Sequence, residues 1–232
     1  MTLLTSTCLT DRGSAKAQRD MAIAARRERE REARREAILD AAARTVQARG
    51  VRDARMEEIA AAAEVSKGTL YLYYPSKDAL LAGLAERNIR GALPHLEAVA
   101  TNDATGLDRL LGMVDAFVAH MDSSPNMYRL MIEWMNQDDI DDSSEAFAAY
   151  RARVATVMQL MVQCMQDGTR DGSIRADVDP LHQTLQVWSS CLGVLLMRQN
   201  AKAMSKRIAV PVDFARLLPL HLDTLRLALE AG

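Results

Sequence analysis

The residues best suited to chemistry lie in one short stretch of the chain, residues 66–74. Ser66 is a residue type that caps the start of a helix. Lys67, Gly68 and Thr69 would then occupy the first turn, where free backbone N–H groups and the helix dipole favour an anion. Gly68 lets a partner approach the backbone closely, at a cost of about 1 kcal/mol relative to alanine. The stretch therefore predicts a contact with phosphate.

Tyrosine and lysine side chains next to this turn extend the predicted phosphate surface. Three of the chain's five tyrosines lie within four positions, among them Tyr71 and Tyr73. Phenolic hydroxyls can donate hydrogen bonds to phosphate oxygens while their rings pack. Lys77, at the start of the next helix, could add another phosphate contact. Leu70 is expected in the core, and Tyr73 could belong either to the core or to the surface.

Short helices must position these groups. Residues 56–63 have an apolar face at helical spacing, and a tight turn follows at 64–66. Residues 67–74 form the next helix, which Pro75 must end. The longer helix that precedes them stops at Gly50, where a left-handed cap is expected. This spacing is typical of a helix-turn-helix, whose second helix enters the major groove of DNA.

The composition favours an all-α protein. The 232 residues are rich in helix formers, only 4% are aromatic, and no strand-like alternation is found. The three cysteines are odd in number and far apart, so neither a zinc knuckle nor a disulfide framework is expected, and a reduced cytoplasmic setting is predicted. The longest apolar run is far shorter than the roughly 20 residues that cross a bilayer. The four histidines are scattered, so no metal and no cofactor are expected.

Charge is distributed unevenly along the chain. Residues 1–81 carry 15 Lys and Arg against 12 Asp and Glu, whereas residues 82–232 carry 14 against 19. The front of the chain is therefore the part expected to face an anion. We interpret residues 1–32 as a flexible, charged N-terminal arm. Its Arg- and Glu-rich part, residues 22–33, is either a solvated helical lead-in or a basic arm that contacts a nucleic-acid backbone.

Residues 38–81 closely resemble the DNA-binding domain of tetracycline-repressor-like (TetR-type) transcriptional regulators. The resemblance is carried by the opening ILDAA, the stop at Gly50 and the run IAAAAEVSKGTLYLYYPSKDALL. It implies an all-α chain with two domains. Residues 33–81 would form a three-helix, helix-turn-helix DNA-binding domain. Residues 82–232 would form a helical effector-binding and dimerisation domain.

The resemblance also implies roles for individual residues. Those placed on or beside the DNA are Arg55, Met56, Ser66, Lys67, Gly68, Thr69, Tyr71, Tyr73 and Lys77. Tyr74 would be an aromatic packing residue rather than a DNA contact.

Two positions depart from the family's pattern. Arg55 stands where Thr or Ser usually caps the second helix together with Glu58, so either Asp53 takes over the cap or the cap is lost, at about 1 kcal/mol. Arg55 could instead reach a phosphate. Glu64 stands where glycine is common, which puts the details of the turn in doubt but not the fold.

Methionine and aromatic residues punctuate the central helices of the second domain. Most of them are expected to build a core, but together they could line a cavity for a flat or flexible apolar molecule, since methionine adapts to varied ligands. The residues assigned to this effector site are Phe117, Met121, Met131, Trp134, Met135, Tyr150 and Met158.

The last two long helices have broad apolar faces, and such a face, if the chain itself does not bury it, must be buried by a partner. The resemblance implies a four-helix interface between two copies. The residues assigned to it are Leu185, Trp188, Leu192, Leu195, Leu218, Leu222 and Leu225. Pro219 is expected to kink the final helix.

The expected function is that of a homodimeric, cytoplasmic repressor. It would bind double-stranded palindromic operator DNA, with two recognition helices about 34–36 Å apart, and a small apolar effector would release it. No arrangement of residues suggests catalysis, so an enzyme is not expected. The alternative is a helical small-molecule carrier, or an enzyme, whose front domain does not bind DNA.

Overall fold

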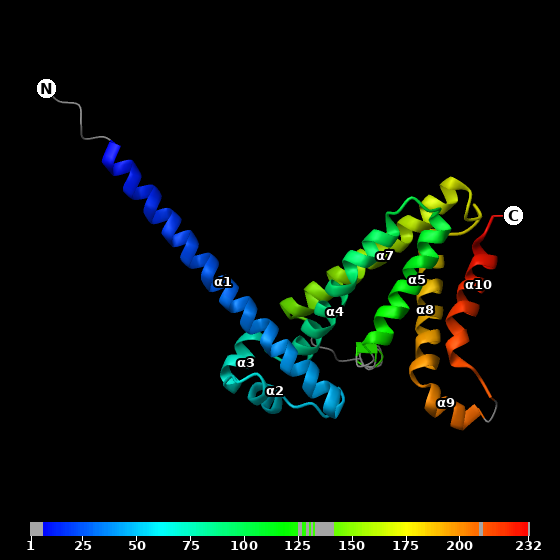
Figure 1. Cartoon of the computed structure of the whole chain (residues 1–232), viewed down its shortest axis with the longest axis horizontal. Coiled ribbons are helices and arrows are strands. Elements are labelled where there is room, and N and C mark those ends of the chain that lie inside the picture. Colours follow the sequence, from blue (N-terminus) through cyan, green and yellow to red (C-terminus); the bar gives the residue numbers. More distant parts are fainter. Residues whose placement is uncertain are drawn as a thin grey trace. The chain divides into compact units, whose positions relative to one another are not determined.

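The computed structural model of the chain describes residues 7–124, 127, 128, 130, 132, 142–208 and 211–231, with side chains from residue 18 onward. Within these ranges the regular elements are helices and no strand is found, which confirms the all-α prediction (Figure 1). The elements are α1 (Thr7–Arg49), α2 (Met56–Ala62), α3 (Lys67–Tyr73), α4 (Lys77–Ala100), α5 (Gly106–Ser123), α7 (Glu145–Asp171), α8 (Pro180–Gln199), α9 (Ala201–Ile208), the 3-10 turn η1 (Phe214–Arg216) and α10 (Leu217–Leu229).

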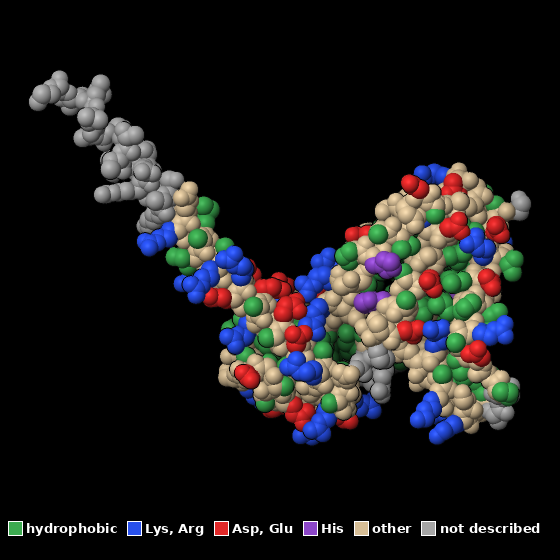
Figure 2. All heavy atoms as spheres, in the orientation of Figure 1, with side chains coloured by type: hydrophobic (Ala, Val, Ile, Leu, Met, Phe, Trp, Pro, Cys, Tyr) green, Lys and Arg blue, Asp and Glu red, His purple; other side chains and the backbone are tan. Residues whose placement is uncertain are grey.

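The chain divides into two compact units, Met1–Tyr73 and Tyr74–Gly232. The domain boundaries expected from the sequence, after residues 32 and 81, stay predictions. Residues 18–32, which the sequence assigned to a flexible arm, belong to the continuous helix α1 and are exposed. Basic and acidic side chains are interspersed along this described part of the helix (Figure 2).

The first unit is built on the C-terminal half of α1, which packs against α2. Ile38 and Leu39 of α1, Ile59 of α2 and Leu70 of α3 are all buried. Gly50 ends α1 with a φ of +86°, as the predicted left-handed cap requires.

The turn between α2 and α3 uses a left-handed residue that is not glycine. Glu64 has a φ of +54°, where a Cβ atom crowds the backbone. Two backbone bonds close the end of α2, from Val65 N to Ala60 O at 3.0 Å and from Glu64 N to Ala61 O at 3.1 Å. This pairing is a Schellman motif, which normally has glycine at the left-handed position. The fold of the turn is therefore kept in spite of the unfavourable residue.

The start of α2 lacks a side-chain cap. Arg55 occupies the N-cap position and makes no capping hydrogen bond, so of the two expected outcomes the cap is lost. Glu58 instead forms an ion pair with Arg49, the last residue of α1, with Oε1 3.5 Å from Nη2.

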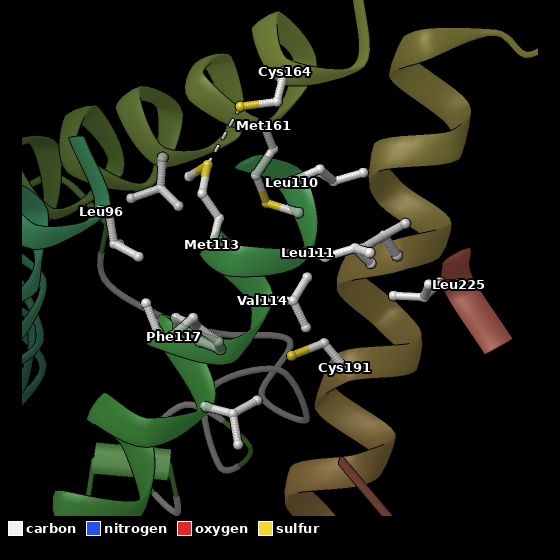
Figure 3. Packing of buried hydrophobic residues seen from close by; sticks show 14 of the residues in the cluster. Leu96, Leu110, Leu111, Met113, Val114, Phe117, Met161, Cys164, Cys191 and Leu225 are labelled. Carbon is white, nitrogen blue, oxygen red and sulfur yellow. Dashed lines mark hydrogen bonds between the residues drawn. The ribbon is translucent and has the colours of Figure 1, made fainter. Parts of the chain in front are cut away.

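The second unit packs α4, α5, α7, α8 and α10 around a core of Leu, Met, Val and Ala side chains (Figure 3). Helix starts follow the expected capping chemistry, with Ser76, Thr105, Ser144 and Asp179 accepting hydrogen bonds from the first turns of α4, α5, α7 and α8.

Prolines lie within α4 and α10. α4 contains Pro94 and continues through it to Ala100, since the neighbouring Leu93 and Leu96 are buried and their packing outweighs one lost backbone hydrogen bond. Pro219 was expected to kink the final helix, and α10 begins at Leu217. Pro219 therefore lies in the first turn, where its missing N–H would have no partner within the helix.

Replacing Glu64 with glycine should stabilise the first unit, because glycine adopts a positive φ without a Cβ clash. We expect Glu64→Gly to raise the free energy of unfolding by about 1 kcal/mol, measured by circular dichroism in guanidinium. The control is Ala62→Gly on the exposed part of α2, which should lower it by about 1 kcal/mol. Equal destabilisation by both substitutions would contradict the assignment of strain to Glu64.

Candidate functional site

α3 is held in place by one cap and one buried side chain. Ser66 Oγ accepts a hydrogen bond from the backbone N–H of Thr69 at 3.0 Å and lies 2.8 Å from Thr69 Oγ1. Leu70 is 0% exposed and anchors the inner face of the helix. Ser66 is thus the cap that the sequence predicted, and Leu70 is the core residue.

The nine residues predicted to lie on or beside the DNA differ in their exposure to solvent. Ser66, Lys67, Gly68, Tyr71 and Arg55 are exposed. The others are half-buried, namely Thr69, Tyr73 and Lys77, or buried, namely Met56.

Met56 requires a correction. It was assigned to the DNA contact, but its side chain packs in the core and only its backbone can serve a contact at the start of α2. Tyr74 is buried, as expected for a packing residue. Its ring lies so close to Gly83 that a Cβ atom there would be 2.7 Å from Tyr74 Cε1.

Lys67 is already engaged by two groups of its own unit. Its Nζ lies 2.5 Å from Glu57 Oε1 and 5.8 Å from the centre of the Tyr71 ring. The hydrogen bond from Lys67 is the largest cause that lowers the pKa of Glu57, and the same bond raises the pKa of Lys67. The pair is therefore fully ionised at neutral pH. Glu57 is a residue of this surface that sequence reasoning missed.

Leu72 is the second residue that sequence reasoning missed. Its side chain is 82% exposed, while Leu70, two positions earlier, is fully buried. Residues two apart on a helix point to nearly opposite faces. The signal was thus present in the sequence: once Leu70 is placed in the core, Leu72 must face outward beside Tyr71.

The second unit contains a cavity of about 260 Å³ between α4, α5, α7 and α8. Its lining residues are Ala85, Asn88, Ile89, Phe117, Met121, Met127, Leu130, Tyr150, Val154 and Trp188. Phe117, Met121 and Tyr150 were assigned to an effector site. Met158 packs against the core and is not in the lining. Met131, Trp134 and Met135 lie outside the described residues.

Trp188 lies in the cavity wall and not on the outer face to which the sequence assigned it. Its ring centre is 4.7 Å from that of Phe117, with the planes tilted by 47°. The error arose because a helix with apolar residues on two sides does not reveal from sequence alone which side faces inward. The pair of rings forms one wall of the cavity.

The cavity wall is apolar and carries no charged side chain among the described lining residues. Its polar side-chain groups are the Asn88 amide, the Tyr150 hydroxyl and the Trp188 indole N–H. Asn88 Oδ1 lies 3.1 Å from Nε2 of His120, whose pKa burial lowers, and burial also raises the pKa of Tyr150. An uncharged ligand with one or two hydrogen-bonding groups therefore suits the cavity, since a charge would be desolvated there without a partner.

The two thiols of this unit are not activated nucleophiles. Burial raises the pKa of Cys164 to about 11 and that of Cys191 to about 12, so both are protonated at neutral pH. Cys164 Sγ lies 3.8 Å from Met113 Sδ in the core (Figure 3). Both cysteines serve as packing residues.

Most of the leucines assigned to a dimer interface belong to the core of their own chain. Leu192, Leu195, Leu218 and Leu225 are buried, Leu222 packs against the core, and Leu185 is exposed. The adjacent helices α8 and α10 carry exposed leucines at Leu181, Leu185, Leu196, Leu220 and Leu227, and of these Leu185 alone had been assigned to the interface.

No three His, Cys, Asp or Glu side chains of the described ranges lie together in a way that could hold a metal ion. Among the described helices, none combines the length and the apolarity that crossing a membrane requires.

Comparison with known proteins identifies the family. Residues 38–84 match the model of bacterial regulatory proteins of the tetR family. The chain is 30% identical over 181 residues to the HTH-type transcriptional repressor KstR of Mycolicibacterium smegmatis. The aligned residues cover 77% of this chain and 85% of that protein.

Solved structures show the same fold. The fatty acid degradation regulator FadR from Bacillus halodurans has a TM-score of 0.65 at 16% identity, covering 82% of this chain and 97% of that one. FadR from Bacillus subtilis in complex with stearoyl-CoA has a TM-score of 0.62 at 18% identity, covering 82% and 96%. The fold, the match to the family model and the identity to KstR all lead to one conclusion. The chain belongs to the tetR family of bacterial regulatory proteins and is a DNA-binding transcriptional regulator.

Proposed function

We propose that this regulator is a cytoplasmic, homodimeric repressor without enzymatic activity. It binds palindromic operator DNA through α3 and leaves it when a small apolar molecule occupies the cavity of the second unit. The observation that carries the proposal is the two-sided character of α3: Leu70 is buried while Lys67, Tyr71 and Leu72 face solvent. An exposed leucine beside a cation and a phenol suits a DNA groove better than it suits water.

On DNA, the exposed residues would divide into two groups. Arg55, Lys67 and the backbone N–H of Gly68 would contact phosphates, with Lys77 and Ser66 beside them. Tyr71 and Leu72 would reach base edges, where an apolar side chain contacts the methyl group of thymine. Phosphate contacts would supply affinity, and these base contacts would supply sequence preference.

The exposed leucines of α8 and α10 would bury one another in a second copy of the chain. Leu181 and Leu185 are one helical turn apart on α8, and Leu220 and Leu227 are two turns apart on α10. Each pair therefore lies along one side of its helix. Pairing these two helices with their symmetry mates gives a four-helix interface, and its two-fold symmetry would match a palindromic operator.

The effector would be a mainly apolar molecule. The uncharged wall of the cavity supports this, and methionine residues in the lining can adapt to different shapes. The similar FadR of Bacillus subtilis was solved with stearoyl-CoA, whose acyl chain is apolar. Binding would favour the conformers of the dimer that fit DNA poorly, by the ligand's difference in affinity between the two states.

Leu72→Ala should weaken DNA binding without unfolding the protein. We expect about 30-fold weaker binding to the DNA upstream of the chain's own coding region, measured by gel shift, because each of the two subunits loses an apolar contact of about 1 kcal/mol. Leu70→Ala, two positions away, should instead destabilise the fold by about 2–5 kcal/mol. Val212→Ala, an exposed apolar position of the second unit, is the control for DNA binding. Unchanged binding by Leu72→Ala would remove α3 from the DNA contact.

The cavity should bind N-phenyl-1-naphthylamine, a neutral fluorophore that emits in apolar sites. Trp134→Phe leaves Trp188 as the single tryptophan, in the cavity wall. We expect saturable energy transfer from Trp188 to the probe. Val154→Phe, which fills the cavity from α7, should weaken probe binding at least tenfold. Ala148→Phe, on an exposed position of α7 outside the lining, should leave it unchanged. Absence of transfer, or equal effects of both phenylalanines, would contradict the effector site.

A further inference from the structure

A carboxylate lies among the cations of the surface that we assign to DNA. Glu57 is in the first turn of α2, and its Oε1 is 2.5 Å from the Nζ of Lys67, the first residue of α3. The two side chains are 59% and 58% exposed, so the pair sits at the surface of the first unit and not in its core. The positive charge of Arg55 also acts on this carboxylate.

The position of Glu57 has an electrostatic consequence for DNA binding. Binding to DNA of any sequence is driven by cations that neutralise phosphates and release condensed counterions. A lysine whose ammonium is paired with a carboxylate cannot neutralise a phosphate, and so cannot displace a counterion from the DNA, until that ion pair is broken. The carboxylate itself is repelled by the phosphates. A glutamate at this place therefore opposes the binding of DNA that the rest of the surface promotes.

The fold gains little from the pair. Exposed ion pairs contribute about 0–1 kcal/mol because water and salt screen them. Glu57 is also not needed to start α2, since its neighbour Glu58 supplies a second carboxylate in the same turn and pairs with Arg49. Removing the charge of Glu57 should thus leave the fold intact, so its effect on DNA can be measured by itself.

We propose that Glu57 is an intramolecular counter-ion that holds Lys67 and lowers the affinity of this regulator for DNA of unrelated sequence. The inference rests on the proposed contact of α3 with DNA. The expected consequence is greater sequence specificity. Because the ammonium of Lys67 is kept from the phosphates, the contacts of Tyr71 and Leu72 with base edges contribute a larger share of the binding free energy. Glu57 is a specificity-determining residue that acts through Lys67.

The test uses full-length protein and a random-sequence duplex of about 24 bp, long enough for two half-sites one helical turn apart. Affinity is measured by fluorescence anisotropy as the salt concentration is varied. The variants are Glu57→Gln, Lys67→Met and the double substitution. The matched control is Glu64→Gln, which removes another exposed carboxylate of the same unit. Circular dichroism confirms that each variant is folded.

We expect Glu57→Gln to bind the random duplex more tightly and with a slope of log K against log salt that is steeper by about 1.8, which is about 0.9 for the added phosphate contact of each subunit of the dimer. Such a slope makes the gain in affinity fall about twelvefold as salt rises fourfold. In the Lys67→Met background the effect of Glu57→Gln should shrink to that of Glu64→Gln, since no lysine remains to be released.

Two results would overturn the inference while leaving the proposed function standing. Weaker binding by Glu57→Gln would show that Glu57 positions Lys67 for DNA. An equal effect of Glu57→Gln with and without Lys67 would show that it acts only through net charge. If Lys67→Met and Leu72→Ala both bind DNA as the wild type does, the contact of α3 with DNA is wrong, and the proposed function fails with it.

Discussion

The burial of Leu70 is the constraint on which the proposed recognition of DNA by α3 depends. α3 has seven residues, and an isolated helix of that length is not stable in water. It is helical because Leu70 is fixed in the core of the first unit and because Ser66 satisfies the N–H of Thr69. Together they set the direction of the outer face. Once Leu70 points inward, Leu72, two positions later on nearly the opposite side of the helix, must point outward, and Lys67 and Tyr71 are also exposed.

Local signals in the sequence were enough to predict the end of α1, helices α2 and α3 and the start of α4, but not the extent of α1, whose residues 18–32 were expected in a flexible arm. Gly50 at the end of α1, and Ser66 and Ser76 as caps, act through their own backbone or through bonds to residues three positions away, so a pattern of neighbours reveals them. Glu64 stands where the family commonly has glycine, and the local sequence pattern does not show how the turn accommodates it. A residue with a Cβ atom is strained there, but two backbone bonds around the turn keep its geometry.

The remaining features depend on contacts between segments that are distant in the sequence. Trp188 was assigned to an outer face because α8 has apolar residues on two sides, and only its packing against Phe117 decides between them. The pairing of Glu57 with Lys67 spans ten residues and two helices, and no spacing rule for one helix predicts it. Met56, which was predicted to contact DNA, is likewise buried in the core.

We propose that two copies of α3 read DNA together from one side. Hydroxyl-radical footprinting of the DNA upstream of the coding region tests it most directly. We predict two protected patches on the same face of the duplex, with centres about 10 base pairs apart and symmetric sequences beneath them. A single protected patch, or two patches on opposite faces, would contradict the claim.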